Sequence, residues 1–224
     1  MKLLAIDCSA SLCAACVYDA AADRLLGRHV LDLGKGHAEH LLAVIDKALA
    51  DAGVTYADLG AIAVSTGPGS FTGIRVGVSA ARGLALALKI PAIGVTTLEA
   101  LAAEAATIFP GRVVLAVLDG GRSEIHAALF GADGLARHGP AIVTLSDAAL
   151  MATENAAVLA GTAAETVADA AGGVFDFGPL AATADIATYA RLAARKGPGE
   201  KPKPVYLRDA DAKPQAGFVL PRAG

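Results

Sequence analysis

The chain has 224 residues, of which 54% are hydrophobic and 18% are charged, and its formal net charge is -3. This composition indicates a packed core in one large or two small domains and excludes wholesale disorder. The net negative charge argues against tight, unaided nucleic-acid binding, which neutralises many phosphates. Residues 1–17 lack the pattern of a signal peptide, and charges or glycines interrupt every candidate span, so we expect a cytoplasmic protein with no membrane segment.

The chain begins with a predicted strand over residues 3–6 that ends at Asp7, followed by a polar turn and a returning strand over 12–18. A third strand is expected over 24–33. This opening resembles that of the actin-like ATPases and sugar kinases, in which the acid and the N–H groups of the turn face phosphate and metal. The turn here lacks the usual glycine, so the resemblance implies a degenerate nucleotide site at Asp7 and Ser9. A carboxylate that caps its own turn explains Asp7 equally well.

The three cysteines, Cys8, Cys13 and Cys16, all lie in this first hairpin. Residues 13 and 16 are an odd number apart, so on a strand they face opposite sides. We therefore expect small buried hydrophobic residues rather than a two-cysteine metal or redox site.

An amphipathic helix is predicted over residues 37–52, with Gly53 as a left-handed cap at its end. His37 and His40 share one face of this helix, which raises the alternative of a metal pair. A stable metal site needs three or four ligands, and the sequence places no other His, Cys or acid beside these two. Polar residues at a helix start, or contacts with a partner, are the favoured explanation, and we predict no metal site.

The most informative stretch is residues 65–77, Ser-Thr-Gly-Pro-Gly-Ser-Phe-Thr-Gly-Ile-Arg-Val-Gly, between a buried strand at 61–64 and a helix at 74–89. A glycine-rich turn between strand and helix can present backbone N–H groups to an anion. The stretch has no Gly-Lys-Ser/Thr and no G-x-G-x-x-G, so a tight connection is favoured over a phosphate site. Thr72 is expected to cap the helix.

Small residues four apart, Gly73, Gly77, Ala81 and Ala85, follow one side of that helix. Glycine inside a helix costs roughly 0.5–1 kcal/mol relative to alanine, so the stripe indicates that another backbone comes close. That backbone belongs either to the chain's own sheet or to a second protein, and the structure discriminates between the two by showing what covers the stripe.

Basic residues also recur every seven positions on this helix, at Arg75, Arg82 and Lys89. They form either a solvated edge or a charged rim around a helix–helix contact. Our hypothesis is that the helices at 37–52 and 73–89 pair with the same helices of a second actin-like chain. The residues assigned to this interface are His37, His40, Leu41, Ile45, Gly73, Ile74, Arg75, Gly77, Val78, Ala81, Arg82 and Ala85.

Further along, a strand at 92–95 precedes a helix that begins with the capping box Thr96-x-x-Glu99 and runs to about residue 107. A strand at 113–118 then ends in Asp119, and after a polar turn a strand returns over 125–130. This repeats the plan of residues 3–18 and indicates an internal duplication. Asp119 and Glu124 suit either an acid–base pair or, as we favour, a charged hairpin turn.

The remaining elements are weaker. Strands are expected at 141–144 and 156–160, with helices starting near Ser146, over 162–171, and over 184–196 after a Thr183 cap. We expect three parts: an N-terminal lobe with the pairing helices at 1–109, a smaller C-terminal lobe at 110–197, and a Pro- and Lys-rich, partly mobile tail at 198–224. Tyr206 and Leu207 are expected to pin the tail to the body.

Three pieces of the sequence stand out together: Leu-Ala-Ile-Asp at 4–7, Gly-Pro-Gly-Ser-Phe-Thr-Gly-Ile-Arg-Val-Gly at 67–77, and Pro-Val-Tyr-Leu-Arg at 204–208. Together they resemble the TsaB (YeaZ) family, bacterial proteins that take part in making threonylcarbamoyladenosine in tRNA. The central motif is specific to that family, and the pieces span nearly the whole chain. The helix start at 37–42 is similar to the family's first helix.

This resemblance implies a duplicated actin-like fold (ASKHA, ribonuclease H-like) with two α/β lobes, each a central mixed sheet flanked by helices. It implies a non-catalytic scaffold needed for threonylcarbamoyl transfer to N6 of the adenosine next to the anticodon (t6A). The implied partners are a TsaD-like catalytic subunit, a TsaE-like ATPase and a second copy through the same helices, with tRNA reached through the complex. ATP and metal then belong to the partners, and this chain binds no cofactor tightly.

The residues agree with a non-catalytic role, because the His-x-x-x-His with which TsaD-like relatives bind metal is missing. Cys8 stands where the family commonly has threonine, and residues 119–126 depart from the usual Asp-Ala-Arg-x-x-Glu-Val-Tyr, which weakens a nucleotide site at Asp119. Two alternatives stay open. One is an independent actin-fold ATPase or kinase that uses Asp7 and Asp119; the other is a metallo-glycopeptidase homologue, which the missing histidine pattern argues against.

Overall fold

The computed structural model describes residues 1–207. The first half of the chain builds a five-stranded sheet in the order β3-β2-β1-β4-β5, and the second half builds a four-stranded sheet in the order β8-β7-β6-β9. The strands are β1 (Lys2–Asp7), β2 (Leu12–Asp19), β3 (Arg24–Asp32), β4 (Leu59–Ser65), β5 (Ala92–Val95), β6 (Val114–Asp119), β7 (Ile125–Phe130), β8 (Ala136–Val143) and β9 (Val158–Ala160).

The two sheets repeat one plan of connections, which confirms the predicted duplicated actin-like α/β fold. In each half, three antiparallel strands are followed by a helix and then by a strand parallel to the first. A bridge between Leu159 and Phe177 takes the place of β5 in the second half. The helices are α1 (His37–Ala52), α2 (Phe71–Leu88), α3 (Thr97–Ile108), α4 (Leu145–Glu154), α5 (Ala164–Ala171) and α6 (Ile186–Lys196), with a 3₁₀ turn at Tyr56–Asp58.

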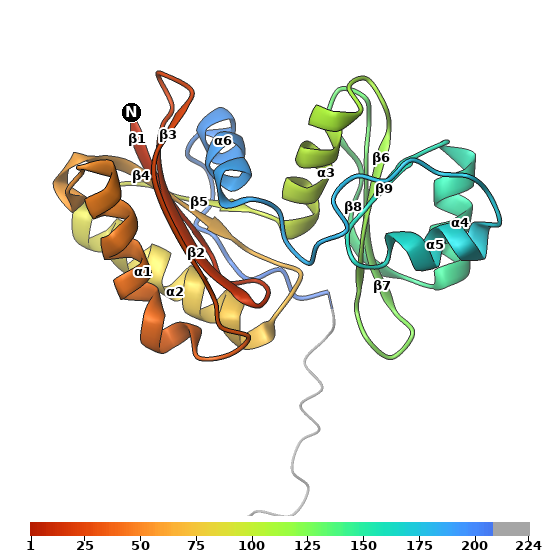
Figure 1. The fold of residues 1–224 in the computed structure, drawn as a ribbon, viewed down its shortest axis with the longest axis horizontal. Helices are drawn as coiled ribbons and strands as arrows, with labels where there is room; N and C mark the ends of the chain where they lie inside the picture. Colours follow the sequence, from red (N-terminus) through yellow and green to blue (C-terminus); the bar gives the residue numbers. More distant parts are fainter. Residues whose placement is uncertain (208–224) are drawn as a thin grey trace, which may run out of the picture.

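Helices and sheets alternate in layers (Figure 1). Helices α1 and α2 cover the outer face of the first sheet, α3 and α6 lie between the sheets, and α4 and α5 cover the second sheet. A buried apolar cluster fills each space between these layers. Alternation along β2 places Cys13 in the cluster under α1 and α2 and Cys16 in the central cluster, as predicted.

The two central helices each pack against the sheet of the other half. Helix α3 contacts β6, β7 and β9, whereas α6 contacts β1, β2, β4 and β5. The predicted boundary between residues 109 and 110 separates the two sheets along the chain, but these helices connect the halves in space. One continuous buried cluster through α3 and α6 therefore joins both sheets.

Several helix starts and one strand differ from prediction. Strand β8 begins at Ala136, earlier than the expected 141, because its polar residues hide the strand pattern. The predicted caps Thr72, Ser146 and Thr183 do not cap their helices. The cap is the residue at which the backbone enters the helix, and each predicted hydroxyl lies two residues away from that position. The observed caps are Ser70, Thr144 and Asp185.

Residues 198–207, here called the strap, return from the end of α6 to the first sheet. The Val205 N–H donates to the Thr66 carbonyl at 2.8 Å, and Tyr206 accepts a hydrogen bond from Arg75 on α2. The predicted pinning by Tyr206 is thereby confirmed. The rest of the tail, from Arg208 to the end, lies outside the described residues, and the mobility expected there stays a prediction.

Candidate functional site

The glycine-rich connection between β4 and α2 packs closely against the turn after β1. A Cβ on Gly69 would lie 2.2 Å from the Ser9 carbonyl oxygen, and the Ser70 N–H donates to that same oxygen at 2.7 Å. The side chain of Ser70 then accepts from the Gly73 N–H at 3.2 Å. Since the N–H groups of Ser70 and Gly73 are bonded within the chain, the geometry favours the tight connection over the anion site.

The small-residue stripe of α2 is covered by the chain's own sheet. A Cβ on Gly73 would lie 2.0 Å from the Cys8 carbonyl oxygen, and one on Gly77 would meet Val64 and Cys8 at 3.6 and 3.7 Å. Ala81 and Ala85 are buried in the same cluster. The close backbone that the glycines indicated belongs to the β1–β2 turn, so the idea that the stripe faces a second protein is wrong.

The predicted interface residues separate into two groups. Most point inward: His37, Leu41, Ile45, Gly73, Ile74, Gly77, Val78, Ala81 and Ala85 are buried within the chain, so they hold the helices on the sheet and are not available to a partner. His40, Arg75 and Arg82 are exposed on the outer face of the helices. The hypothesis of an interface on α1 and α2 therefore depends on outward-facing residues, most of which the sequence analysis did not single out.

Large apolar side chains lie on that outward face. Leu42 on α1 and Phe71 on α2 are each 58% exposed, and Leu86 near the end of α2 is 80% exposed. Within the described residues, α2 is the one helix long and apolar enough to span a membrane by length and composition, and 33% of it is buried. The sequence analysis did not single out these residues. The sequence feature that could have indicated them is a large apolar residue on the side of the helical wheel that faces away from the buried stripe.

Exposed charges differ in sign between the two helices. Helix α1 carries Glu39, Asp46 and Asp51 on its exposed side, with Lys47 bound to Asp51 at 2.6 Å, whereas α2 carries Arg75 and Arg82. Both helices start beside the β1–β2 turn, because the Leu33 and Ser70 N–H groups donate to Ser11 and Ser9 respectively. The outward surface therefore has an acidic strip beside a basic strip, and the two helices run in the same direction.

The Asp7 carboxylate lies in a buried polar cluster between β1 and α6. Its side chain accepts from the Ser9 N–H at 2.9 Å and from the Thr183 hydroxyl at 2.7 Å, and Asp7 is 1% exposed. Thr183 also lies 2.7 Å from the Tyr189 hydroxyl. Burial, with the nearby Asp7 charge, raises the pKa of Tyr189 well above its usual range, so this phenol stays protonated.

This cluster fills the position where the sequence pattern suggested a nucleotide site. Thr183 and Tyr189 come from the segment that leads into α6 and from α6 itself, so the chain supplies its own partners for Asp7. The Thr97 and Ser9 hydroxyl groups also act on the Tyr189 hydroxyl as hydrogen-bond partners. The predicted cap Thr183 is used here, which explains why it does not cap α6.

Asp119 is not brought to this cluster. It ends β6, its carboxylate accepts from the Gly121 N–H at 2.7 Å, and its own N–H donates to Thr162 at 3.1 Å. These contacts stay within the second half of the chain, as in a charged hairpin turn. His37 and His40 likewise gather no further ligands, and the described residues contain no group of three or more His, Cys, Asp or Glu that could hold a metal ion.

Comparison with known proteins identifies the relatives of this chain. Residues 32–188 match the family model of TsaD, tRNA N6-adenosine threonylcarbamoyltransferase. The TsaB protein of Escherichia coli, a tRNA threonylcarbamoyladenosine biosynthesis protein, is 33% identical over 59% of this chain and 56% of its own length. An uncharacterised Mycobacterium tuberculosis protein is 35% identical over 86% of this chain and 84% of its own.

Among solved structures, YeaZ from Pseudomonas aeruginosa superposes with a TM-score of 0.72 at 28% identity, covering 92% of this chain and 99% of that one. This structural match extends over both sheets. In sequence, the chain spans about half the length of the curated TsaB relatives that it matches. The chain therefore belongs to the TsaD family of the matching model and, within it, to the TsaB (YeaZ) proteins.

Proposed function

We propose that this chain is a non-catalytic scaffold subunit in the synthesis of threonylcarbamoyladenosine in tRNA, needed for transfer of the threonylcarbamoyl group by a TsaD-like subunit. The observation that carries the proposal is the outward face of α1 and α2, where Leu42, Phe71 and Leu86 remain exposed beside charged strips. Large apolar side chains gathered on one exposed face are typical of protein-binding surfaces. The TsaB names of the relatives supply the pathway.

A protein contact explains α2 better than a membrane does. Its inner side packs into the core of the first sheet, and its outer side carries Arg75 and Arg82 among the apolar residues. Two guanidinium groups on the outer side are costly in hydrocarbon but suit the rim of a protein interface. We accordingly place the protein in the cytoplasm, without a membrane segment.

The cluster at Asp7 supports the non-catalytic part of the proposal. Both carboxylate oxygens already accept hydrogen bonds from the chain, and the group is 1% exposed. A nucleotide phosphate or a metal ion there would have to displace Thr183 and Tyr189. In our proposal ATP and metal are bound by the partner subunits, and this chain holds no cofactor tightly.

The proposed partners are a TsaD-like transferase, a TsaE-like ATPase and a second copy of this chain, with tRNA bound through the complex. The model of the TsaD family aligns with α1 and α2 of this chain. A partner of the same fold therefore has a corresponding helix pair. Such a pair can pack against α1 and α2 in the same way as a second copy would.

Reconstitution tests the proposal. The TsaD-like and TsaE-like proteins of the same organism are given tRNA and the threonylcarbamoyl donor, with and without this chain. We expect t6A to form only with it, and Leu86→Arg to lower transferase affinity more than tenfold. Leu150→Arg on α4 is the matched control, since Leu150 is also exposed, at 56%. Full modification without this chain would reject the scaffold role.

The alternative of an independent actin-fold ATPase is tested separately. If purified chain hydrolysed ATP and lost the activity on Asp7→Ala, the ATPase would replace the scaffold as the preferred function. We expect no hydrolysis above a buffer control, because Asp7 is bonded to Thr183 inside the protein. Metal analysis of the same sample tests the metallo-glycopeptidase, and stoichiometric zinc or iron would favour it.

A further inference from the structure

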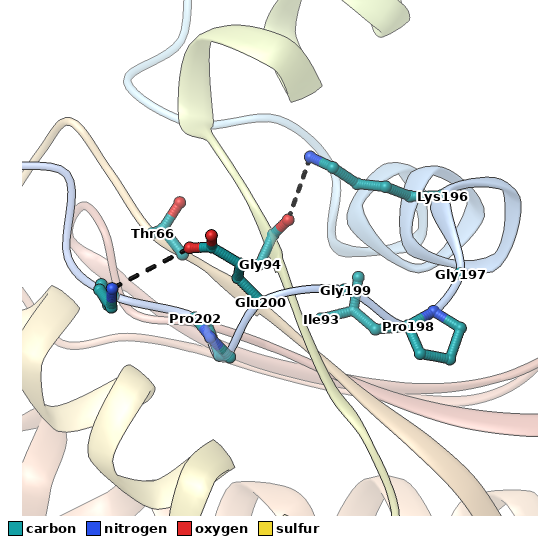
Figure 2. Close-up of a pocket in the computed structure, with 10 residues that line it drawn as sticks. Thr66, Ile93, Gly94, Lys196, Gly197, Pro198, Gly199, Glu200 and Pro202 are labelled. Carbon is teal, nitrogen blue, oxygen red and sulfur yellow. Dashed lines mark hydrogen bonds and ion pairs between the residues drawn. The ribbon is translucent and has the colours of Figure 1, made fainter.

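The strap is fixed to the first sheet at two points before it reaches α2. Pro202 is buried, and its Cβ lies 3.2 Å from the position that a Cβ on Gly94 would take. Figure 2 shows this part of the strap beside β5, where Lys196 donates to the Gly94 carbonyl at 3.3 Å next to a hollow of about 250 Å³. The second point is the hydrogen bond from the Val205 N–H to Thr66.

Beyond the second point, Tyr206 meets the first turn of α2. Its hydroxyl accepts from Arg75 Nε at 2.8 Å, and its ring centroid is 6.0 Å from that of Phe71. The guanidinium carbon of Arg75 lies 3.6 Å from the Phe71 ring centroid and 5.4 Å from that of Tyr206. Two aromatic rings thus hold the Arg75 side chain in one orientation.

This cluster is on the surface. Phe71 is 58% exposed and Tyr206 is 53% exposed. Arg75 uses its Nε for Tyr206, and its Nη groups make no hydrogen bond within residues 1–207. Guanidinium groups bind carboxylates or phosphates through two parallel N–H bonds, and fixing the side chain in advance removes part of the entropic cost of binding. Exposed Tyr and Arg are also the residues that most often dominate protein interfaces.

We propose that the strap and the first turn of α2 form one docking element, in which Phe71 and Tyr206 orient Arg75 to bind a carboxylate on the TsaD-like partner subunit. This inference rests on the proposed function. It adds the strap to the interface that was proposed on α1 and α2. A carboxylate is favoured over an RNA phosphate, because the chain has a net charge of -3 and α2 exposes a large apolar side chain near each of its ends, Phe71 and Leu86.

Binding of purified full-length variants to the cognate TsaD-like subunit, measured by calorimetry, tests the element. Tyr206→Ala removes both the ring and the acceptor, and we expect at least a fivefold loss of affinity. Val205→Pro removes the N–H that anchors the strap but keeps Tyr206, so the same direction is expected. Tyr206→Phe keeps the ring and should lose less than Tyr206→Ala. Leu135→Ala, an exposed leucine of the second half (69%), should change nothing.

The comparison with Leu86→Arg separates failure of this inference from failure of the proposed function. If Leu86→Arg abolishes binding while Tyr206→Ala and Val205→Pro bind as wild type, the docking element is wrong and the scaffold stands. If none of the three changes binding, the docking element is wrong, and so is the outward face of α1 and α2 as the interface that carries the proposed function. A third result also overturns the inference: Tyr206→Ala leaves subunit binding intact but weakens binding of an anticodon stem-loop RNA to the assembled complex, measured by fluorescence anisotropy. Circular dichroism must show that each variant is folded.

Discussion

The Thr183 hydroxyl donates to the Asp7 carboxylate at 2.7 Å across 176 positions of the chain. Asp7 ends the first strand, and Thr183 lies where the chain returns from the second sheet to α6. The contact therefore joins the two ends of the duplicated fold at a buried point. It explains why an acid that resembles a nucleotide ligand in the sequence has become part of the connection between the halves.

Thr183→Val should destabilise the protein by about 1–3 kcal/mol, because the substitution leaves one buried carboxylate oxygen of Asp7 without a donor. Thr188→Val is the matched control: Thr188 is a buried threonine of α6 whose hydroxyl makes no side-chain hydrogen bond within residues 1–207. Urea unfolding followed by circular dichroism measures both. Equal stability of the two variants would mean that the Asp7 contact contributes nothing measurable.

The two glycines of the buried stripe should respond differently to alanine. Gly73→Ala places a Cβ 2.0 Å from the Cys8 carbonyl oxygen, so the backbone must move, at a cost of roughly 1–3 kcal/mol. Gly77→Ala meets its neighbours at 3.6 Å or more, and Gly83 faces open space. Those two variants should be neutral or gain about 0.5–1 kcal/mol from the helix. Thermal unfolding of all three variants measures these differences in stability. A Gly73→Ala variant of wild-type stability would contradict the close packing of Gly73 against Cys8.

Much of the fold follows from the sequence, because buried strands and amphipathic helices carry a strong period. The helix at 37–52 and its left-handed Gly53 cap are observed as predicted. The packing of α3 and α6 against the sheet of the opposite half was not predictable, since it depends on contacts between residues far apart in the chain. At the site, small residues at helical spacing correctly indicated that another backbone lies close to α2. They could not show whether that backbone belongs to this chain or to a second protein, and the structure assigns it to the turn at Cys8.

The opposite charges of α1 and α2 predict the register of self-association. In the proposed dimer, a two-fold axis perpendicular to the helices would set α2 antiparallel to α1 of the other copy and bring Arg82 near Asp46, since each lies close to the middle of its helix. Arg82→Glu should weaken the dimer roughly tenfold, since two symmetric pairs become repulsive. Asp46→Lys should do the same, and the double variant should recover. Sedimentation equilibrium tests this, and an additive loss in the double variant would rule out the pairing.

The three thiols should be unreactive in the folded protein. Cys8, Cys13 and Cys16 are all 0% exposed, and burial, with the Asp185 charge, raises the pKa of Cys16 to about 12. Cys16 therefore has almost no thiolate at pH 8, and the thiolate is the form that attacks a disulfide reagent. The hydrogen bond with Cys8 lowers the pKa of Cys13, so that thiol is protected by its burial alone. Titration with an aromatic disulfide at pH 8 should therefore give no rapid reaction in buffer. The same titration should give three equivalents in about 6 M guanidinium, which unfolds all but the most stable domains. Rapid reaction of even one thiol in buffer would show that the β1–β2 hairpin opens, and with it the contact between the Cys8 carbonyl and Gly73 on which the position of α2 depends.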